Sequence, residues 1–84
     1  MKTAKKIQPE FNLIGLVKDS VEHLTAEDGR VQAIVDSKMT GVYWVTLYIS
    51  GQQVATDWTT SKRDAKRLAR EFMRAGSNIK APTT

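Results

Sequence analysis

The chain has 84 residues, enough for one small domain that buries about 60–65% of its unfolded surface and has no room for a large internal cavity. It contains no cysteine, which excludes disulfides and thiolate-bound metal, and no apolar run of membrane-spanning length. The net charge of +4 is uneven: residues 1–6 carry +3, residues 7–61 carry −4 and residues 62–84 carry +5. We therefore expect a soluble protein of the cytoplasm or the nucleoid, without a membrane partner, whose basic ends suit a polyanion.

Residues 1–8 contain three lysines and lack an apolar repeat, so we expect a flexible basic tail. Apolar residues then recur at helical spacing from Leu13 to Leu24, which predicts a helix over residues 9–24 with Pro9 in its first turn. A competing interpretation uses the turn signal Glu27-Asp28-Gly29. Because Asp-Gly closes hairpins, residues 21–25 and 31–35 would pair as strands and that helix would be lost.

The middle of the chain predicts three strands. Residues 31–36 form a short one, residues 37–41 a loop, and Val42 to Ser50 the strongest one, because β-branched and aromatic residues fill it. Residues 51–53 turn the chain, and residues 54–59 return as the third strand. Alternation along the central strand places Tyr43, Val45, Leu47 and Ile49 on a core face, and Trp44, Thr46 and Tyr48 on an open face. The open face is a candidate surface for a protein partner or a homodimer, and base stacking is a further use of its aromatics.

Ser61 to Ala75 predicts the clearest helix. Ser61 can cap its first turn, Asp64 follows three residues later as in a capping box, and Gly76 is the residue type that commonly ends a helix. One arc is apolar, and a separate arc holds six cations: Lys62, Arg63, Lys66, Arg67, Arg70 and Arg74. Cations in the first turn, and like charges four residues apart, each destabilise a helix by about a few tenths of a kcal/mol. Their clustering indicates a docking site for a phosphate backbone, although a basic face kept for solubility has the same pattern.

The predicted fold is α+β: helix, three antiparallel strands and helix over residues 9–76, with both helices on one face of the sheet and a flexible tail over residues 77–84. This layout resembles the double-stranded RNA-binding domain, and Ser61-Lys62-Arg63-Asp64-Ala65-Lys66 is similar to the signature that opens the last helix of that family. The resemblance implies phosphate contacts by Lys62, Arg63 and Lys66, with Arg67 and Arg70 as outer contacts. It also implies a second contact region at Lys38 to Gly41.

A second resemblance is to the arm-site DNA-binding domain of tyrosine-family phage integrases. It depends on the strand Tyr43 to Ile49, the following glycine turn, and Thr60 to Ala65 at the start of the helix. In that family the sheet enters the DNA major groove.

The residues show no nucleophile with a base, no carboxylate pair in a cleft and no metal cluster, and the single histidine, His23, is expected to be solvated. We therefore expect a protein without cofactor or enzymatic activity that binds duplex RNA or DNA through its last helix. The alternatives are a sheet-based DNA binder and a small interaction or inhibitor protein that grips an acidic partner or dimerises. The sequence does not separate RNA from DNA, or monomer from homodimer.

Overall fold

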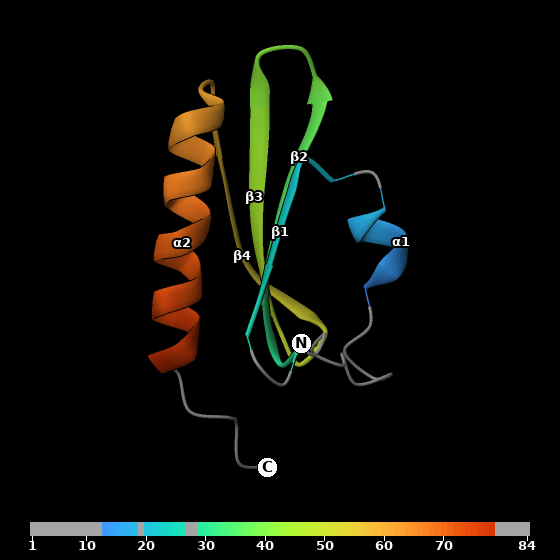
Figure 1. The fold of residues 1–84 in the computed structure, drawn as a ribbon, viewed down its shortest axis with the longest axis vertical. Coiled ribbons are helices and arrows are strands. Elements are labelled where there is room, and N and C mark those ends of the chain that lie inside the picture. Colours follow the sequence, from blue (N-terminus) through green and yellow to red (C-terminus); the bar gives the residue numbers. More distant parts are fainter. Residues whose placement is uncertain (1–12, 19, 27–28, 79–84) are drawn as a thin grey trace, which may run out of the picture.

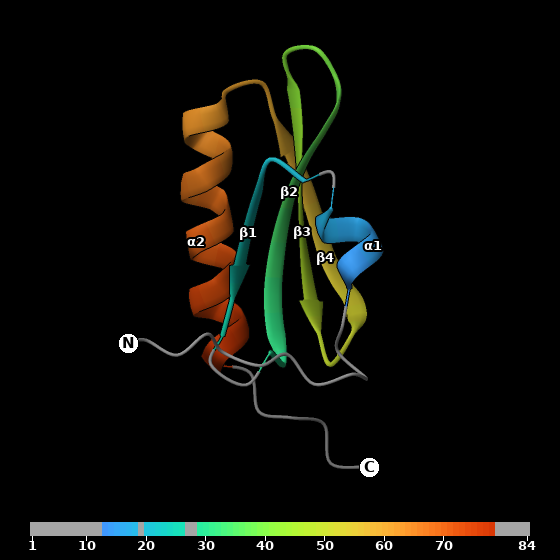
Figure 2. The ribbon, with the colours of Figure 1, turned by 45° about the vertical axis from the view of Figure 1, so that its right-hand side comes forward.

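The computed structural model of this protein describes residues 13–18, 20–26 and 29–78. Antiparallel strands form a four-stranded sheet in the order β1-β2-β3-β4, with bounds Glu22–Thr25, Val31–Met39, Val42–Ile49 and Gln52–Thr59. The long helix α2 (Lys62–Asn78) lies along one face of this sheet, and the single turn α1 (Ile14–Val17) lies on the opposite side (Figures 1 and 2). The predicted tail at residues 1–8 lies outside the described residues. The tail predicted over residues 77–84 is wrong for Ser77 and Asn78, which belong to α2, and the rest of it lies outside the described residues.

The predicted three-stranded sheet with both helices packed on one face is wrong, because residues assigned to the first helix form a strand. β1 pairs antiparallel with β2, from Glu22 opposite Val35 to Thr25 opposite Gln32. Every residue from Val31 to Val35 is buried, which is the pattern of a strand with a neighbour on each side. The competing hairpin interpretation is the correct one for these residues.

The helix predicted over residues 9–24 is reduced, within the described part of the chain, to the four residues of α1. Gly15 lowers the helical propensity of this turn by about 1 kcal/mol relative to alanine. After the turn, the amide of Ser20 donates to the carbonyl of Val17 at 2.9 Å and its hydroxyl donates to the same oxygen at 2.7 Å. These local bonds end the helix and leave the following residues available to pair with β2.

The hairpin between β3 and β4 is closed by Ser50 and Gly51, one residue earlier than predicted. Both have positive φ, 54° and 79°, as a two-residue type I′ turn requires. A bulge after Leu47, which is opposite Ala55, lets Tyr48 pair with Gln53. Gly41, in the preceding hairpin, has a φ of 82° and serves that turn through its backbone.

The core lies between α2 and the sheet. Its buried residues are small or β-branched where the layers are closest: Ala33, Val35 and Val45 from the sheet, and Ala65 and Ala69 from the helix. Phe72 and Met73 pack against this cluster and also against a second one formed by Val31, Leu47 and Ile49. Because alanines face each other across the layers, the helix can approach the sheet closely along its length. The prediction that Tyr43, Val45, Leu47 and Ile49 face the core is confirmed.

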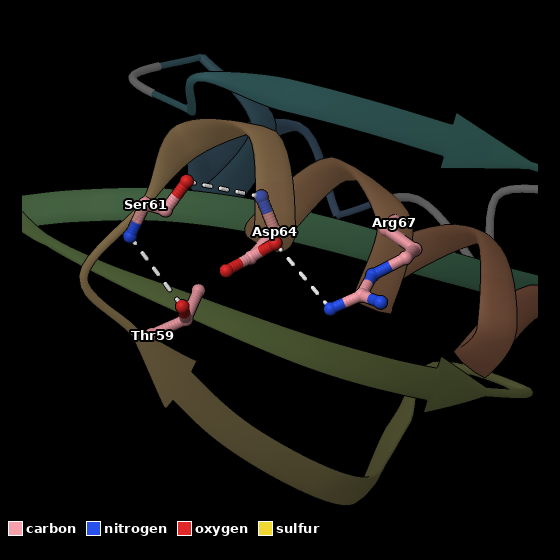
Figure 3. Close-up of polar contacts among 4 residues, drawn as sticks. All are labelled: Thr59, Ser61, Asp64 and Arg67. Atoms are coloured by element: carbon pink, nitrogen blue, oxygen red, sulfur yellow. Dashed lines mark hydrogen bonds and ion pairs between the residues drawn. The ribbon is translucent and has the colours of Figure 1, made fainter.

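Ser61 caps the start of α2 as predicted, but the amide of Ser61 donates to Thr59 and not to Asp64 as in the predicted capping box (Figure 3). The amide of Asp64 donates to the hydroxyl oxygen of Ser61 at 3.3 Å, and the amide of Ser61 donates to the hydroxyl oxygen of Thr59 at 3.4 Å. The carboxylate of Asp64 meets Arg67, at 3.3 Å from its Nη2. Side chains therefore satisfy two backbone donors at the helix start.

The predicted role of Gly76 as the end of the helix is wrong, since α2 continues to Asn78. Gly76 is buried, and a Cβ placed on it would lie 2.8 Å from Cγ1 of Val31 and 3.3 Å from Cδ1 of Leu47. This glycine is needed because the helix backbone touches the side chains of β2 and β3 there.

Candidate functional site

The outer face of α2 carries a row of exposed arginines. Arg63, Arg67, Arg70 and Arg74 follow one another at intervals of four, three and four residues, so they lie on one side of the helix, opposite the buried Ala65 and Ala69. At 1.5 Å per residue the row is about 16 Å long. These four residues are called the arginine row below.

Three members of the arginine row surround a hollow in the protein surface. The hollow measures about 390 Å³ and is lined by Arg63, Asp64, Arg67 and Arg70. Nη2 of Arg67 lies 3.3 Å from the carboxylate of Asp64, so these two lining residues form an ion pair (Figure 3). Three positive groups and one negative group therefore share one open depression.

The two lysines of this helix differ from the arginine row in position and partners. Lys66 extends towards β1 and lies 4.0 Å from Glu22, with both side chains partly exposed. Lys62 is exposed in the first turn. Among the residues that the structure describes, no carboxylate lies within ion-pairing distance of Lys62, Arg63, Arg70 or Arg74. Most of the predicted basic face is thus available to a ligand.

The basic side chains of α2 include two at the start of the helix, an end that attracts anions by itself. The helix contains six cations and two anions, Asp64 and Glu71, so its side chains sum to +4. Lys62 and Arg63 lie in the first turn of the helix, where the helix dipole adds a partial positive charge. An anion bound at this end would meet side-chain and backbone donors together.

The face of the sheet opposite α2 has a different character. An open groove of about 490 Å³ crosses it, with Leu16 of α1 among its lining residues. The predicted open-face residues Trp44, Thr46 and Tyr48 all line this groove. Among the described residues that line it, Asp36 and Lys38 are the only charged ones, and they form an ion pair at 3.8 Å. Burial, and then the charge of Asp36, raise the pKa of Tyr48, so its hydroxyl remains a neutral donor.

Sequence reasoning missed the part of β4 that belongs to this face. Trp58 lies opposite Trp44, with ring centroids 6.3 Å apart and planes tilted by 50°. Thr56 lies opposite Thr46, and their hydroxyl oxygens are 3.2 Å apart. Alternation along residues 54–59 contained the signal for Thr56 and Trp58. The bulge that brings Gln53 to the same face had none.

The second contact region implied by the resemblance does not join the arginine row. Lys38 lines the groove on the opposite side of the sheet, and Gly41 belongs to the turn between β2 and β3. Comparison of the chain with models of protein families, with curated proteins and with solved structures gives no match.

Neither a metal centre nor a membrane span is found in the described part of the chain. No group of three or more histidine, cysteine, aspartate or glutamate side chains there could hold a metal ion. None of the described helices combines the length and the apolar character that crossing a membrane requires.

Proposed function

We propose that this protein is a non-catalytic nucleic-acid-binding module that contacts the phosphate backbone of a duplex through the arginine row of α2. One observation carries the proposal: three arginines surround a single hollow on an exposed helix face that the core does not use. A helix stabilised by its buried face needs no such cluster. Its presence is explained if the face binds a polyanion.

Guanidinium groups suit this role. Each offers paired donors that match two phosphate oxygens, and each stays charged at any physiological pH. Backbone phosphates of one DNA strand advance about 3.4 Å along the duplex axis, so a row about 16 Å long spans roughly four or five of them. Contacts of this kind fix the position of a protein on a duplex without reading bases. We therefore expect binding with little sequence preference and a dissociation constant of about 10⁻⁶ to 10⁻⁴ M at physiological salt.

The alternative that places DNA on the sheet is less well supported. The described lining of the groove on the open face carries one anion and one cation that offset each other, and is otherwise uncharged. A phosphate backbone approaching this face would gain little electrostatic attraction. An acidic protein surface remains a second class of ligand for the arginine row, and polyglutamate serves as its probe below.

The test compares two variants that lose the same charge from opposite sides of the molecule. Arg63→Gln/Arg70→Gln removes two cations from the hollow, whereas Lys18→Gln/Lys38→Gln removes two exposed cations outside α2. Binding to duplex DNA, duplex RNA and single strands of about 20 nucleotides is measured by fluorescence anisotropy between about 50 and 200 mM salt. We expect the first variant to flatten the plot of log K against log salt by about 1.8, and the second to leave the slope nearly unchanged.

Equal losses in the two variants would refute a site on α2, because they would report only the overall charge. Binding of polyglutamate as tight as that of the duplexes would instead assign the arginine row to acidic proteins. Asp64→Asn supplies a test of opposite sign, because it removes a carboxylate that lines the hollow. It should strengthen duplex binding by about fivefold, as expected for about 1 kcal/mol of repulsion near a phosphate in water.

A further inference from the structure

We propose that the open face of the sheet is a homodimer interface in which Trp58 of each copy inserts into the groove of the other. This inference is independent of duplex binding by α2. It rests on the shape, the charge and the exposed apolar area of the face opposite that helix.

The open face has both a projecting side chain and a groove. Trp58 is 55% exposed and stands next to Trp44, which lines the groove, but Trp58 is not itself a lining residue. The groove, of about 490 Å³, falls in the size range of sites that enclose a drug-sized group, so it can take an indole. A two-fold axis between two such faces lets each tryptophan occupy the groove of the other copy. Self-complementarity of this kind is what a symmetric dimer requires.

The charges of the molecule favour a second copy as the occupant. The Asp36–Lys38 pair leaves the groove without net charge as far as its described lining goes, and the same pair can bond reciprocally across a two-fold axis. The opposite face carries the +4 of α2, which repels another α2. Two copies therefore approach with least repulsion when their open faces meet and their helices point outwards. The arginine rows stay accessible in that arrangement.

The exposed apolar area is sufficient for association. Trp44 and Trp58 are 39% and 55% exposed, which amounts to about 200 Å² for side chains of this size. Met39 and Leu16, also lining the groove, are 62% and 50% exposed. Even with the threonines and Gln53 of the same face, the patch is smaller than the roughly 800 Å² per partner of a standard interface and has the size of a weak, transient one. Along β3 and β4 the tryptophan pair is followed by the threonine pair and then by Tyr48 opposite Gln53, so the patch offers both apolar and polar contacts.

The mass of the full chain is measured by sedimentation equilibrium from about 5 µM to about 1 mM, the range in which small interfaces associate. We expect the mass to rise from 9.4 kDa towards twice that value. Trp58→Ser should raise the dimer dissociation constant at least about thirtyfold, the loss typical of truncating an interface tryptophan. Circular dichroism shows whether the variant keeps its fold.

A matched pair of charge insertions tests the location of the interface. Gln53→Arg places a cation in the groove, whereas Val54→Arg places the same cation on the next residue of β4, which is 51% exposed and does not line the groove. Gln53→Arg should abolish the dimer, and Val54→Arg should leave it unchanged. A constant mass of 9.4 kDa at the highest concentration would overturn the proposal. A dimer that tolerates both Trp58→Ser and Gln53→Arg would also overturn it. Loss of the dimer with Val54→Arg would overturn it as well, because that loss would indicate pairing through the edge of β4.

Discussion

Replacement of Gly76 by alanine tests whether α2 approaches the sheet as closely as the structure shows. Inside an ordinary helix this change stabilises by up to about 1 kcal/mol, because glycine has the poorer helical propensity. In this protein the added methyl would lie 2.8 Å from Cγ1 of Val31, a distance at which one of the two groups must move. Val31 is 1% exposed and β-branched, so it has no free rotamer to adopt. Leu47 Cδ1, at 3.3 Å, belongs to a more adaptable side chain.

The magnitude follows from two opposing effects. Overpacking of a closed core costs about 1–3 kcal/mol, and the gain in propensity offsets up to about 1 kcal/mol of it. We expect Gly76→Ala to lower the free energy of unfolding by about 1 kcal/mol, which lowers Tm by about 4–8 °C for a chain of this size. In a Val31→Ala background the obstructing Cγ1 is gone. There the same change at Gly76 should be neutral or stabilising.

Urea unfolding of the four proteins of this cycle, followed by circular dichroism, gives the coupling between the two positions. A coupling of about 1–3 kcal/mol, with a change of sign between backgrounds, supports the close approach. An increase in Tm caused by Gly76→Ala in the natural chain would refute the close approach. Such a result would mean that the helix stands farther from β2 than the structure indicates.

Three further changes follow from the local geometry. Ser50→Asn should raise the free energy of unfolding by about 0.5–1 kcal/mol, because asparagine tolerates the positive φ of 54° better than serine does. Thermal unfolding measures this gain, and an unchanged Tm would count against the turn assignment. Ser61→Ala should cost about 1 kcal/mol in urea unfolding by removing the acceptor for the Asp64 amide, whereas its neighbour Thr60→Ala should cost little. Gln32→Met should cost about 2 kcal/mol or more by the same assay, because the buried amide bonds the ring of His23 at 2.8 Å and the carbonyl of Gly29 at 3.0 Å. A loss of less than 0.5 kcal/mol there would mean that water replaces these bonds.

The last helix and the central strand could be predicted because their signals are local. Ser61 is followed by an uninterrupted apolar period, and residues 42–49 alternate between two faces. The end of the helix could not be predicted in this way. Glycine has two uses, to permit a left-handed turn or to permit a close approach, and only the neighbours of Gly76 in β2 and β3 decide between them.

Part of the helix predicted over residues 9–24 forms a strand instead. The apolar spacing of these residues also fits a helix, and a periodic pattern does not show which strand a segment pairs with. Leu24 satisfies the helical repeat, but it also lies opposite Ala33 in β1 and packs on the core. In the structure β2 pairs with β1 and with β3 and is buried from Val31 to Val35, whereas the predicted three-stranded sheet would leave this strand at an edge.

The candidate sites likewise contain parts that local sequence patterns predict and parts that depend on contacts between distant residues. The positions of the arginine row follow from helical geometry, so the sequence placed them on one face. The contact of Lys66 with Glu22 could not be predicted, because the sequence assigns Glu22 to a helix. The sequence also did not show that Lys38 lies on the side of the sheet opposite α2. Trp58 was not recognised as part of the open face, because its neighbour Trp44 is fourteen residues away in sequence and adjacent only across the β3–β4 pair.

The cost of the basic helix can be compared with the packing that supports it. Four pairs of like charges stand four residues apart in α2, for example Arg63 with Arg67 and Arg70 with Arg74, and together they destabilise the helix by about 1–2 kcal/mol. The ion pairs of Lys66 and Arg67 with carboxylates recover part of that. Burial of Ala65, Ala69 and the half-buried Phe72 against the sheet does not involve the outer face. The fold therefore tolerates a surface that is unfavourable for its own helix, which is the condition under which a binding function can determine that surface.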